Sequence, residues 1–370
     1  MQHKHDISST QLGMMITMIV LGTTILFVPG LSIHLGGRDA WLAPLASGLV
    51  GLFIVMTLLK LSKWFPGQTP IQYFQVLFGK WLGLAIGLYL ISVLLRQFAT
   101  MIRELTDFTT TVTLTRTPPE YILILMLAVV YYGVRQGLEV VARVTQLVVI
   151  IELIQLVFSV VSLSTKDIDL DHLTPLFENG PLPFLRSSMF IVSWFGELLI
   201  VGFLLPSVRL KQGAKKAGIY GIGAVTVLLI LANVYTLGVF GEVIASRLQY
   251  GLYEVARYIS IANFLERLDP IVMGVWILLI YCKLAIFCYA VSIAVSQLFS
   301  LPDYRSVVGL VCLVGAVMSE HMYRHQADMM HFLEVIYPPY ALLMALVGLP
   351  FLLFLGFLRK GKRKEAPSRA

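Results

Sequence analysis

Long apolar runs dominate this chain, and they limit its fold more than any other feature. A helix needs about 20 apolar residues to cross a bilayer, and about ten stretches of the sequence reach or approach that length. They lie at 11–34, 40–62, 82–107, 119–134, 138–164, 185–207, 217–241, 268–298, 306–322 and 331–358. The sequence therefore predicts an all-α integral membrane protein with about ten transmembrane helices.

The composition excludes an ordinary soluble domain. Of the 370 residues, 58% are hydrophobic and 13% are charged, whereas soluble domains carry about 25% charged residues. One soluble core could not cover so much apolar surface. The continuous runs also argue against a transmembrane barrel, whose strands alternate in polarity over about ten residues. The three cysteines, Cys282, Cys288 and Cys312, fall within apolar runs, and we interpret them as buried small hydrophobic residues.

Lysine and arginine are concentrated in alternate loops. With the N-terminus in the cytoplasm, the inside segments hold Lys80, the basic stretch 209–216 and the tail 359–370. This bias follows the positive-inside rule and predicts that both termini are cytoplasmic. We interpret the basic tail as an anchor beside anionic lipid rather than as a nucleic-acid site.

A polar loop at 165–183 divides the spans into two sets of five. An even division of this kind is typical of transporters built from an internal repeat. We therefore expect a single transmembrane domain over residues 1–370, with repeats at 11–164 and 185–358.

The first and sixth spans are each interrupted near their centres by small and polar residues. Gly22, Thr23 and Thr24 separate two apolar halves of the first span, and the stretch 193–197 does the same in the sixth. Paired interruptions at matching positions point to a substrate site in repeat-built transporters. Ordinary small-residue packing between membrane helices is the alternative.

Broken helices provide groups that suit an amino acid. Glycine lets the backbone leave helical geometry, and the freed N–H groups after Gly22 would suit a carboxylate. The freed carbonyl groups of residues 193–195 would suit an ammonium group. The sequence therefore predicts a mid-membrane pocket for a small zwitterion.

Ionisable residues at membrane depth are costly and are functional candidates. Glu197 lies in the sixth span, Lys283 in the eighth and Arg96 in the third. Glu197 would bind a substrate ammonium group or a proton, or would form an internal ion pair with Lys283 or Arg96. Glu152, in the fifth span, has no evident partner in the sequence.

Other charged residues are spaced for structural pairing. Arg103 and Asp107 are four residues apart, as are Glu139 and Arg143, so each pair shares a helix face. We predict no catalytic residues, no metal ligands and no cofactor, and the sequence leaves a coupled ion open. The predicted substrate-binding residues are Gly22, Thr23, Thr24, Ser193, Trp194, Phe195, Gly196, Glu197, Tyr89 and Lys283.

Several motifs together resemble a known family. They are the first-span sequence from Leu21 to Pro29, the Pro181-Leu182-Pro183 start of the sixth span, the segment from Phe264 to Asp269, and a long tenth span with a basic tail. These resemble the B subunit of spore germinant receptors, the GerAB-type spore germination permeases, within the amino acid–polyamine–organocation transporters.

The resemblance implies an amino acid permease-like fold, in which two inverted five-helix repeats place broken first and sixth helices at the centre. It also implies the inner membrane of the spore, a membrane-bound A subunit and a lipoprotein C subunit as partners, and a small germinant, often an amino acid, as ligand. The leading hypothesis is a receptor subunit that triggers germination. A secondary amino-acid transporter with alternating access is the alternative, and a membrane-embedded enzyme lacks the clustered carboxylates or histidines it would need.

Overall fold

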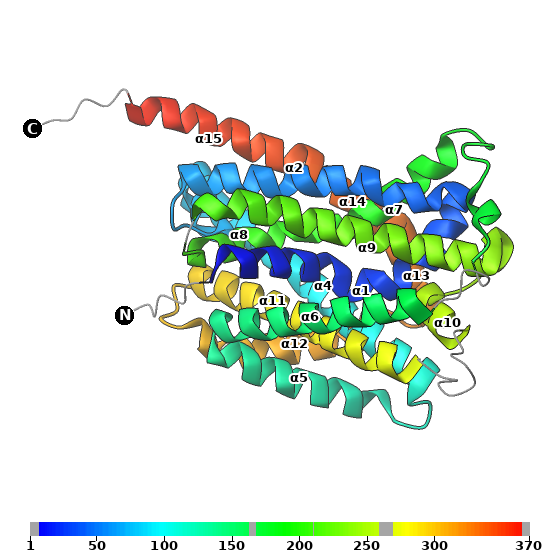
Figure 1. The fold of residues 1–370 in the computed structure, drawn as a ribbon. Helices are drawn as coiled ribbons and strands as arrows, with labels where there is room; N and C mark the ends of the chain where they lie inside the picture. The colour runs from blue at the N-terminus through cyan, green and yellow to red at the C-terminus, as the bar shows by residue number, and fades with distance from the viewer. Residues whose placement is uncertain (1–6, 163–167, 210, 259–268, 365–370) are drawn as a thin grey trace, which may run out of the picture.

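The computed structural model describes residues 7–162, 168–209, 211–258 and 269–364, and within them it is almost entirely helical (Figure 1). One isolated parallel bridge joins Ile7 to Val208. The α-helices are α1 (Ser9–Gly36), α2 (Ala43–Trp64), α3 (Pro70–Phe78), α4 (Lys80–Phe108), α5 (Pro119–Gln136), α6 (Leu138–Ser162), α7 (Leu182–Gly196), α8 (Val201–Leu204), α9 (Lys211–Ala245), α10 (Gly251–Tyr258), α11 (Asp269–Leu298), α12 (Val308–His321), α13 (Gln326–His331), α14 (Tyr337–Leu343) and α15 (Leu349–Lys364).

Each predicted span coincides with a helix or a run of helices. In the described part of the chain, 7 helical segments are long and apolar enough to cross a membrane. The first of them contains both α1 and α2, which are separated by a turn at Gly37 with φ 57°. The shorter helices α5 and α12 pack against α11 within the same bundle. The predicted all-α membrane fold is therefore confirmed, and the three cysteines are buried as predicted.

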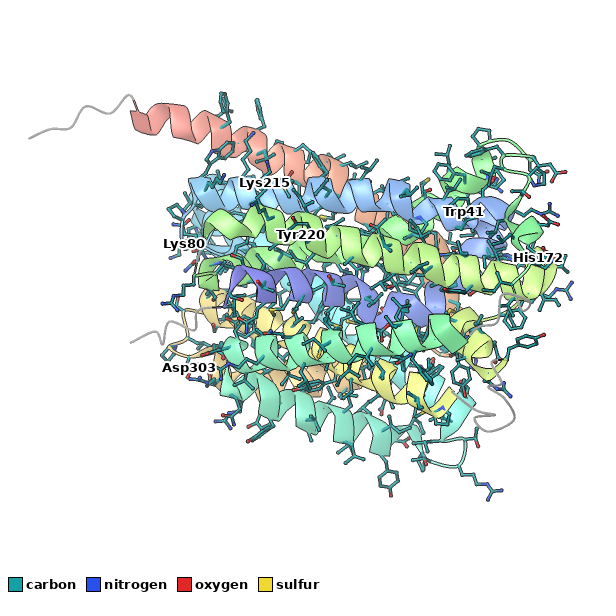
Figure 2. The ribbon with its side chains drawn as sticks, in the orientation of Figure 1. Trp41, Lys80, His172, Lys215, Tyr220 and Asp303 are labelled. Carbon is teal, nitrogen blue, oxygen red and sulfur yellow. The ribbon has the colours of Figure 1, made fainter. Side chains whose placement is uncertain are left out.

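The loops alternate between the two ends of the bundle. We call the end where α1 begins and α15 finishes the terminal end (Figure 1). Lys80, Lys215 and Asp303 lie toward this end, whereas Trp41 and His172 lie toward the opposite end (Figure 2). This is the alternation that the loop charges predicted, and the cytoplasmic placement of the terminal end stays a prediction.

Helix α1 is the centre of the bundle, and small residues let it approach α9 closely. A Cβ added to Gly221 would lie 2.6 Å from the Gly13 carbonyl oxygen, and one added to Gly13 would lie 3.1 Å from that of Ala217. Thr17 Oγ1 also donates to the Gly221 carbonyl at 3.1 Å. Close backbone contact of this kind drives helix association in lipid. The hydrophobic effect does not, because lipid acyl chains are as apolar as the side chains of a neighbouring helix.

The expected break in α1 is absent, because the helix runs without interruption from Ser9 to Gly36. Gly22 and the threonines after it keep helical geometry, and Thr24 Oγ1 donates to the Val20 carbonyl at 2.7 Å. At membrane depth a continuous helix satisfies its own backbone groups, which an unwound segment would leave without partners. The irregular point is Pro29, which has no N–H for the carbonyl four residues before it.

Gly30 is needed for a close approach next to this proline. The turn after α9 passes so near α1 that a Cβ on Gly30 would overlap the Leu248 carbonyl oxygen. The obstacle is backbone rather than the end of a flexible side chain, so it cannot move aside cheaply. A glycine at this position therefore holds the turn against α1.

We predict that Gly30→Ala lowers the free energy of unfolding by about 1–3 kcal/mol, because the added methyl overpacks a backbone contact. Thermal unfolding of the purified protein in detergent would show a lower midpoint. Gly223→Ala is the matched control, since a Cβ there meets nothing within 4 Å and alanine favours the helix. An equal loss of stability in both variants would contradict the prediction.

Candidate functional site

A buried ion pair lies at the centre of the bundle. Lys283, from the middle of α11, is 0% exposed, and its Nζ lies 2.7 Å from Glu197 Oε2. The same ammonium group donates to Thr23 Oγ1 at 2.7 Å. Of the two internal partners that the sequence left open for Glu197, the structure therefore selects Lys283 rather than Arg96.

Residues from three spans meet at this pair. Trp194 Nε1 donates to Thr23 Oγ1 at 3.2 Å, so the threonine hydroxyl joins α1 to both α7 and α11. Helix α7 ends at Gly196, and a 3-10 turn follows over Glu197–Ile200. The sixth span thus changes its helix type at the position where the sequence predicted a break, and this change sets the direction of the Glu197 side chain.

Gly22 makes room for the lysine. A Cβ at Gly22 would lie 2.8 Å from Lys283 Cβ and 2.9 Å from its Cδ. The aliphatic stem of Lys283 therefore passes directly over the glycine. The predicted importance of this position rests here on packing against the lysine and not on an unwound backbone.

Glu104 is a central residue that the sequence patterns did not single out. It lies on α4, is 2% exposed and interacts electrostatically with both Lys283 and Glu197. Its neighbour Arg103 pairs with Asp107 at 2.8 Å, as predicted. In the sequence this i,i+4 pair is conspicuous, and Glu104, which lies between its two members, is easily overlooked. The usable signal was its depth, since a third-span glutamate facing the bundle is costly unless it has a function.

The two carboxylates and one ammonium group give the centre an excess acidic group. Lys283 is in direct contact with Glu197 and can neutralise one charge. Among the described residues the second carboxylate, Glu104, has no direct ion pair, and a buried charge without one is unfavourable. The arrangement therefore suits the binding of an ammonium group next to Glu104.

A small cavity of about 10 Å³ adjoins this centre, with room for about one water molecule. Glu104, Glu197, Thr100 and Trp194 line one side, and Arg96 lies on its wall. The tenth span adds Phe332, Leu333 and Tyr337 to the lining, and α4 also adds Gln97 and Met101. The cavity is thus polar, lies at membrane depth and is closed to a larger ligand in this conformation.

Arg96 brings a positive charge to the same cavity. Its guanidinium group lies 5.2 Å from the centroid of the Phe332 ring and 5.0 Å from that of Tyr340. Within the described ranges, no carboxylate forms a salt bridge with it. Stacking on aromatic rings leaves the hydrogen-bonding edge of an arginine available to a planar anion such as a carboxylate.

Aromatic rings close the bundle between this centre and the end opposite the terminal end. Phe108, one turn beyond Glu104 on α4, lies 4.6 Å from Trp276 and 4.8 Å from Tyr250 between ring centroids. Phe27, one turn beyond Thr23 on α1, lies 5.1 Å from Tyr250. These edge-to-face contacts form a compact layer that separates the polar centre from the opposite end.

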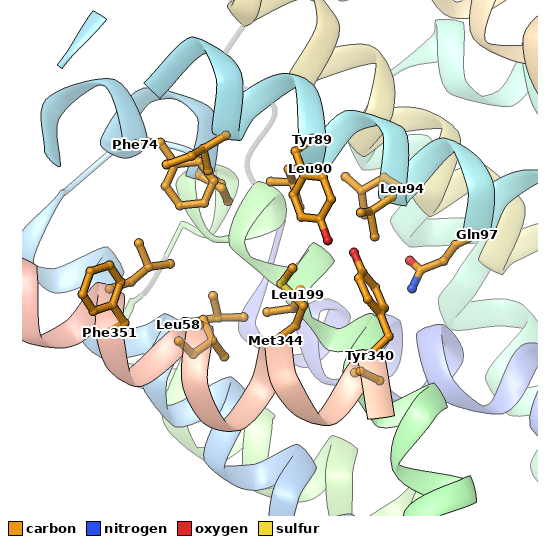
Figure 3. Close-up of a pocket in the computed structure, with 18 of the residues that line it drawn as sticks. Leu58, Phe74, Tyr89, Leu90, Leu94, Gln97, Leu199, Tyr340, Met344 and Phe351 are labelled. Atoms are coloured by element: carbon orange, nitrogen blue, oxygen red, sulfur yellow. The ribbon is translucent and has the colours of Figure 1, made fainter. Parts of the chain in front are cut away.

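Toward the terminal end lies an apolar cavity of about 290 Å³, between α4 and the tenth span (Figure 3). Gln97 and Tyr337 line both this cavity and the small polar one, and Gln97 Nε2 donates to Tyr337 Oη. That hydrogen bond is therefore part of the partition between the two spaces. Tyr89 and Tyr340 point their hydroxyl groups toward one another inside the apolar cavity (Figure 3).

The structure brings half of the predicted site residues together, and the other five make different contacts. Gly22, Thr23, Trp194, Glu197 and Lys283 meet at the centre. The other five have separate positions: Thr24 bonds to its own helix, Ser193 is buried, Phe195 packs against Gly51 on α2, Gly196 packs against Ala341 on α14, and Tyr89 lines the apolar cavity at 48% exposure.

Comparison with known proteins identifies the family. The family model described as "Spore germination protein" matches residues 6–327. This chain belongs to the spore germination protein family. The Phe264–Leu268 part of the motif that suggested this family lies outside the described residues.

Curated relatives match along almost the full chain. Spore germination protein KB of Bacillus subtilis is 26% identical over 98% of this chain and 97% of its own length. Spore germination protein B2 of Bacillus subtilis is 23% identical over 96% of this chain and 97% of its own. The chain is therefore a multi-pass membrane protein that resembles members of this family from end to end.

The fold also matches a solved transporter structure. Mhp1, a nucleobase-cation-symport-1 family transporter in a closed conformation with bromovinylhydantoin bound, superimposes with a TM-score of 0.67 at 15% identity. The match covers 92% of this chain and 78% of that one. The predicted permease-type fold is confirmed.

We predict that Lys283→Met lowers the free energy of unfolding by about 3–5 kcal/mol, because it leaves Glu197 buried without its partner. The double variant Lys283→Met with Glu197→Gln should recover part of that loss. Thermal unfolding of the four proteins of this cycle would measure the coupling. Additive effects of the two substitutions would contradict a direct interaction.

Proposed function

We propose that this protein is the B subunit of a spore germinant receptor and that it binds a small zwitterionic nutrient, an amino acid, at the Lys283–Glu197 centre. The bound nutrient triggers germination together with partner subunits. The observation that carries the proposal is the pair of opposite charges on α4. Glu104 and Arg96 line the same small cavity, so one helix presents an acceptor for an ammonium group and a donor for a carboxylate.

The tenth span is the element that must move to admit such a ligand. Its residues Phe332, Leu333 and Tyr337 close the cavity, and π-helical turns at Phe332–Ile336 and Met344–Gly348 interrupt it on either side of α14. Such turns replace the four-residue hydrogen bonds of an α-helix by five-residue ones and recur at functional sites. A ligand that binds the open arrangement better than the closed one shifts the balance between them.

The resemblance to germinant-receptor B subunits supports the remaining parts of the proposal. The receptor would sit in the inner membrane of the spore with both termini in the cytoplasm. Its partners would be the membrane-bound A subunit and the lipoprotein C subunit. A movement of the tenth span would reach them through the outer surface of the bundle.

We predict that Glu104→Gln and Arg96→Gln each raise the dissociation constant for the bound amino acid at least tenfold. Each removes one charge-assisted contact, and a tenfold change corresponds to about 1.4 kcal/mol. Ligand-induced thermal stabilisation against a panel of amino acids, sugars and nucleosides would measure the effect in nanodiscs, with the chain alone and with the A and C subunits.

Arg103→Gln is the matched control, because Arg103 lies on the same helix but pairs with Asp107 outside the cavity. Its affinity should stay within about twofold of the unmodified protein. If no amino acid stabilises either preparation, or if the control loses as much affinity as the two cavity variants, the proposed site is wrong.

A secondary amino-acid transporter is the second candidate. The apolar cavity beyond Gln97 and Tyr337 reaches Phe78 and Phe351 near the terminal end, so unfilled volume lies between the centre and that end, behind the Gln97–Tyr337 hydrogen bond. Alternating access would need a matching opening through the aromatic layer formed by Phe27, Phe108, Tyr250 and Trp276.

Uptake of the identified amino acid into liposomes containing only this chain separates the two functions. The receptor proposal predicts binding without concentration-dependent uptake above that of empty liposomes. Uptake that saturates and is lost in Glu197→Gln would favour the transporter instead.

A further inference from the structure

A second carboxylate at membrane depth, Glu152, takes no part in the central site. It lies on α6 and is 7% exposed. Within the residues that the structure describes, it has neither an ion pair nor a hydrogen-bond partner. A buried carboxylate without a partner is costly in a membrane bundle, so its position calls for a function.

Glu152 borders two cavities. The larger, of about 440 Å³, lies between α1, α6 and α9 and opens to the surface beside exposed lining residues that include Lys216, Tyr220 and Leu153. Helix α1 is visible between α9 and α6 along this face (Figure 1), and it contacts both. The smaller cavity, of about 50 Å³, continues past Glu152 toward Tyr235.

Other polar groups of α6 face the same space. Gln155 and Ser159 follow Glu152 at helical spacings of three and seven, so the three share a face, and all three line the smaller cavity. Gln155 Oε1 is buried and has no hydrogen-bond partner among the described residues. The Glu152 carboxylate and the Gln155 amide oxygen therefore both belong to residues that line unfilled volume.

Helix α1 separates this space from the central site. Leu21 lines the larger cavity and Ile25 the smaller one, whereas Gly22 and Thr23 contact Lys283. Neighbouring helix positions point about 100° apart, since 3.6 residues make a turn. The two acidic centres are thus at similar depth on different faces of one helix.

Charge within the lining does not satisfy Glu152. Lys216 is the one cationic residue among the described residues that line these cavities. Leu228 of α9 lines both cavities together with Glu152 and therefore marks the level of the glutamate. Lys216 lies more than three helical turns before Leu228, which is about 18 Å along the axis of α9. The ammonium group of Lys216 therefore remains at the mouth of the cavity and does not pair with the glutamate.

We propose that this cavity is a second binding site, for a small molecule that joins an ammonium group to an apolar body. Glu152 accepts the ammonium group, and Gln155 Oε1 is a further acceptor beside it. The other walls are mainly apolar, through residues such as Met18, Leu21 and Val149, and the volume is within the range of small-molecule sites. A hard metal ion fits poorly, because it requires six or more oxygen ligands.

The test compares cyclohexylamine with cyclohexanol, which have the same apolar body and differ in charge. Isothermal titration of the protein in nanodiscs should show saturable binding of cyclohexylamine with a dissociation constant at least tenfold lower than that of cyclohexanol. Glu152→Gln should weaken cyclohexylamine binding at least tenfold and leave cyclohexanol unchanged. Glu152 has no ion-pair partner among the described residues, so Glu152→Gln leaves no cation without its counter-charge and the variant should fold.

Two further variants locate the site. Ala224→Phe should block cyclohexylamine binding by filling the larger cavity while leaving Glu152 in place, since Ala224 lines it. Glu139→Gln, which removes an exposed carboxylate of the same helix, should bind cyclohexylamine as the unmodified protein does. Absence of saturable binding, equal binding of the two compounds, binding unaffected by Glu152→Gln, or an equal loss in Glu139→Gln and Glu152→Gln would overturn the proposal. None of these outcomes depends on whether the central site binds a nutrient.

Discussion

The ion pair between Lys283 and Glu197 determines how the centre of this bundle is built. A buried lysine needs both a counter-charge and a second acceptor, and Glu197 and Thr23 supply them at 2.7 Å each. The stem of the lysine then requires a glycine beside it, and Gly22 provides the space. Three spans are thereby fixed relative to one another, and the change of helix type after Gly196 begins at the residue that pairs with the lysine.

Lys283 and Glu197 already neutralise one another, so the charged groups of the centre that remain available to a ligand are the other two. Glu104 adds a carboxylate that the single lysine does not neutralise in full, and Arg96 adds a cation stacked on aromatic rings. Their common cavity is closed by the tenth span. A ligand with an ammonium and a carboxylate group would replace solvent at Glu104 and at Arg96. Such a ligand would bind the open state better than the closed one and would therefore shift the population toward the open state.

Helix α1 connects the two acidic regions of the molecule. One of its faces contacts Lys283 and the other lines the cavities around Glu152, while small residues hold it against α9. A rigid helix shared by two cavities offers a physical route by which occupancy of one could alter the other. The continuous form of α1 makes this route stiffer than the broken helix that the sequence suggested.

The sequence by itself determined the membrane class, the positions of the spans, the alternation of the loops and the family. Hydrophobic length, loop charge and local motifs are properties of contiguous residues, so no tertiary information was needed. It also singled out Thr23 and Trp194 by the interruptions of the first and sixth spans, and Glu197 and Lys283 as ionisable residues at membrane depth. Only the tertiary structure decided that Lys283 rather than Arg96 pairs with Glu197, that Glu104 joins them, and that α1 stays helical through Gly22. Those outcomes depend on which faces of distant helices meet, and helix packing in lipid is set by close contacts between residues hundreds of positions apart.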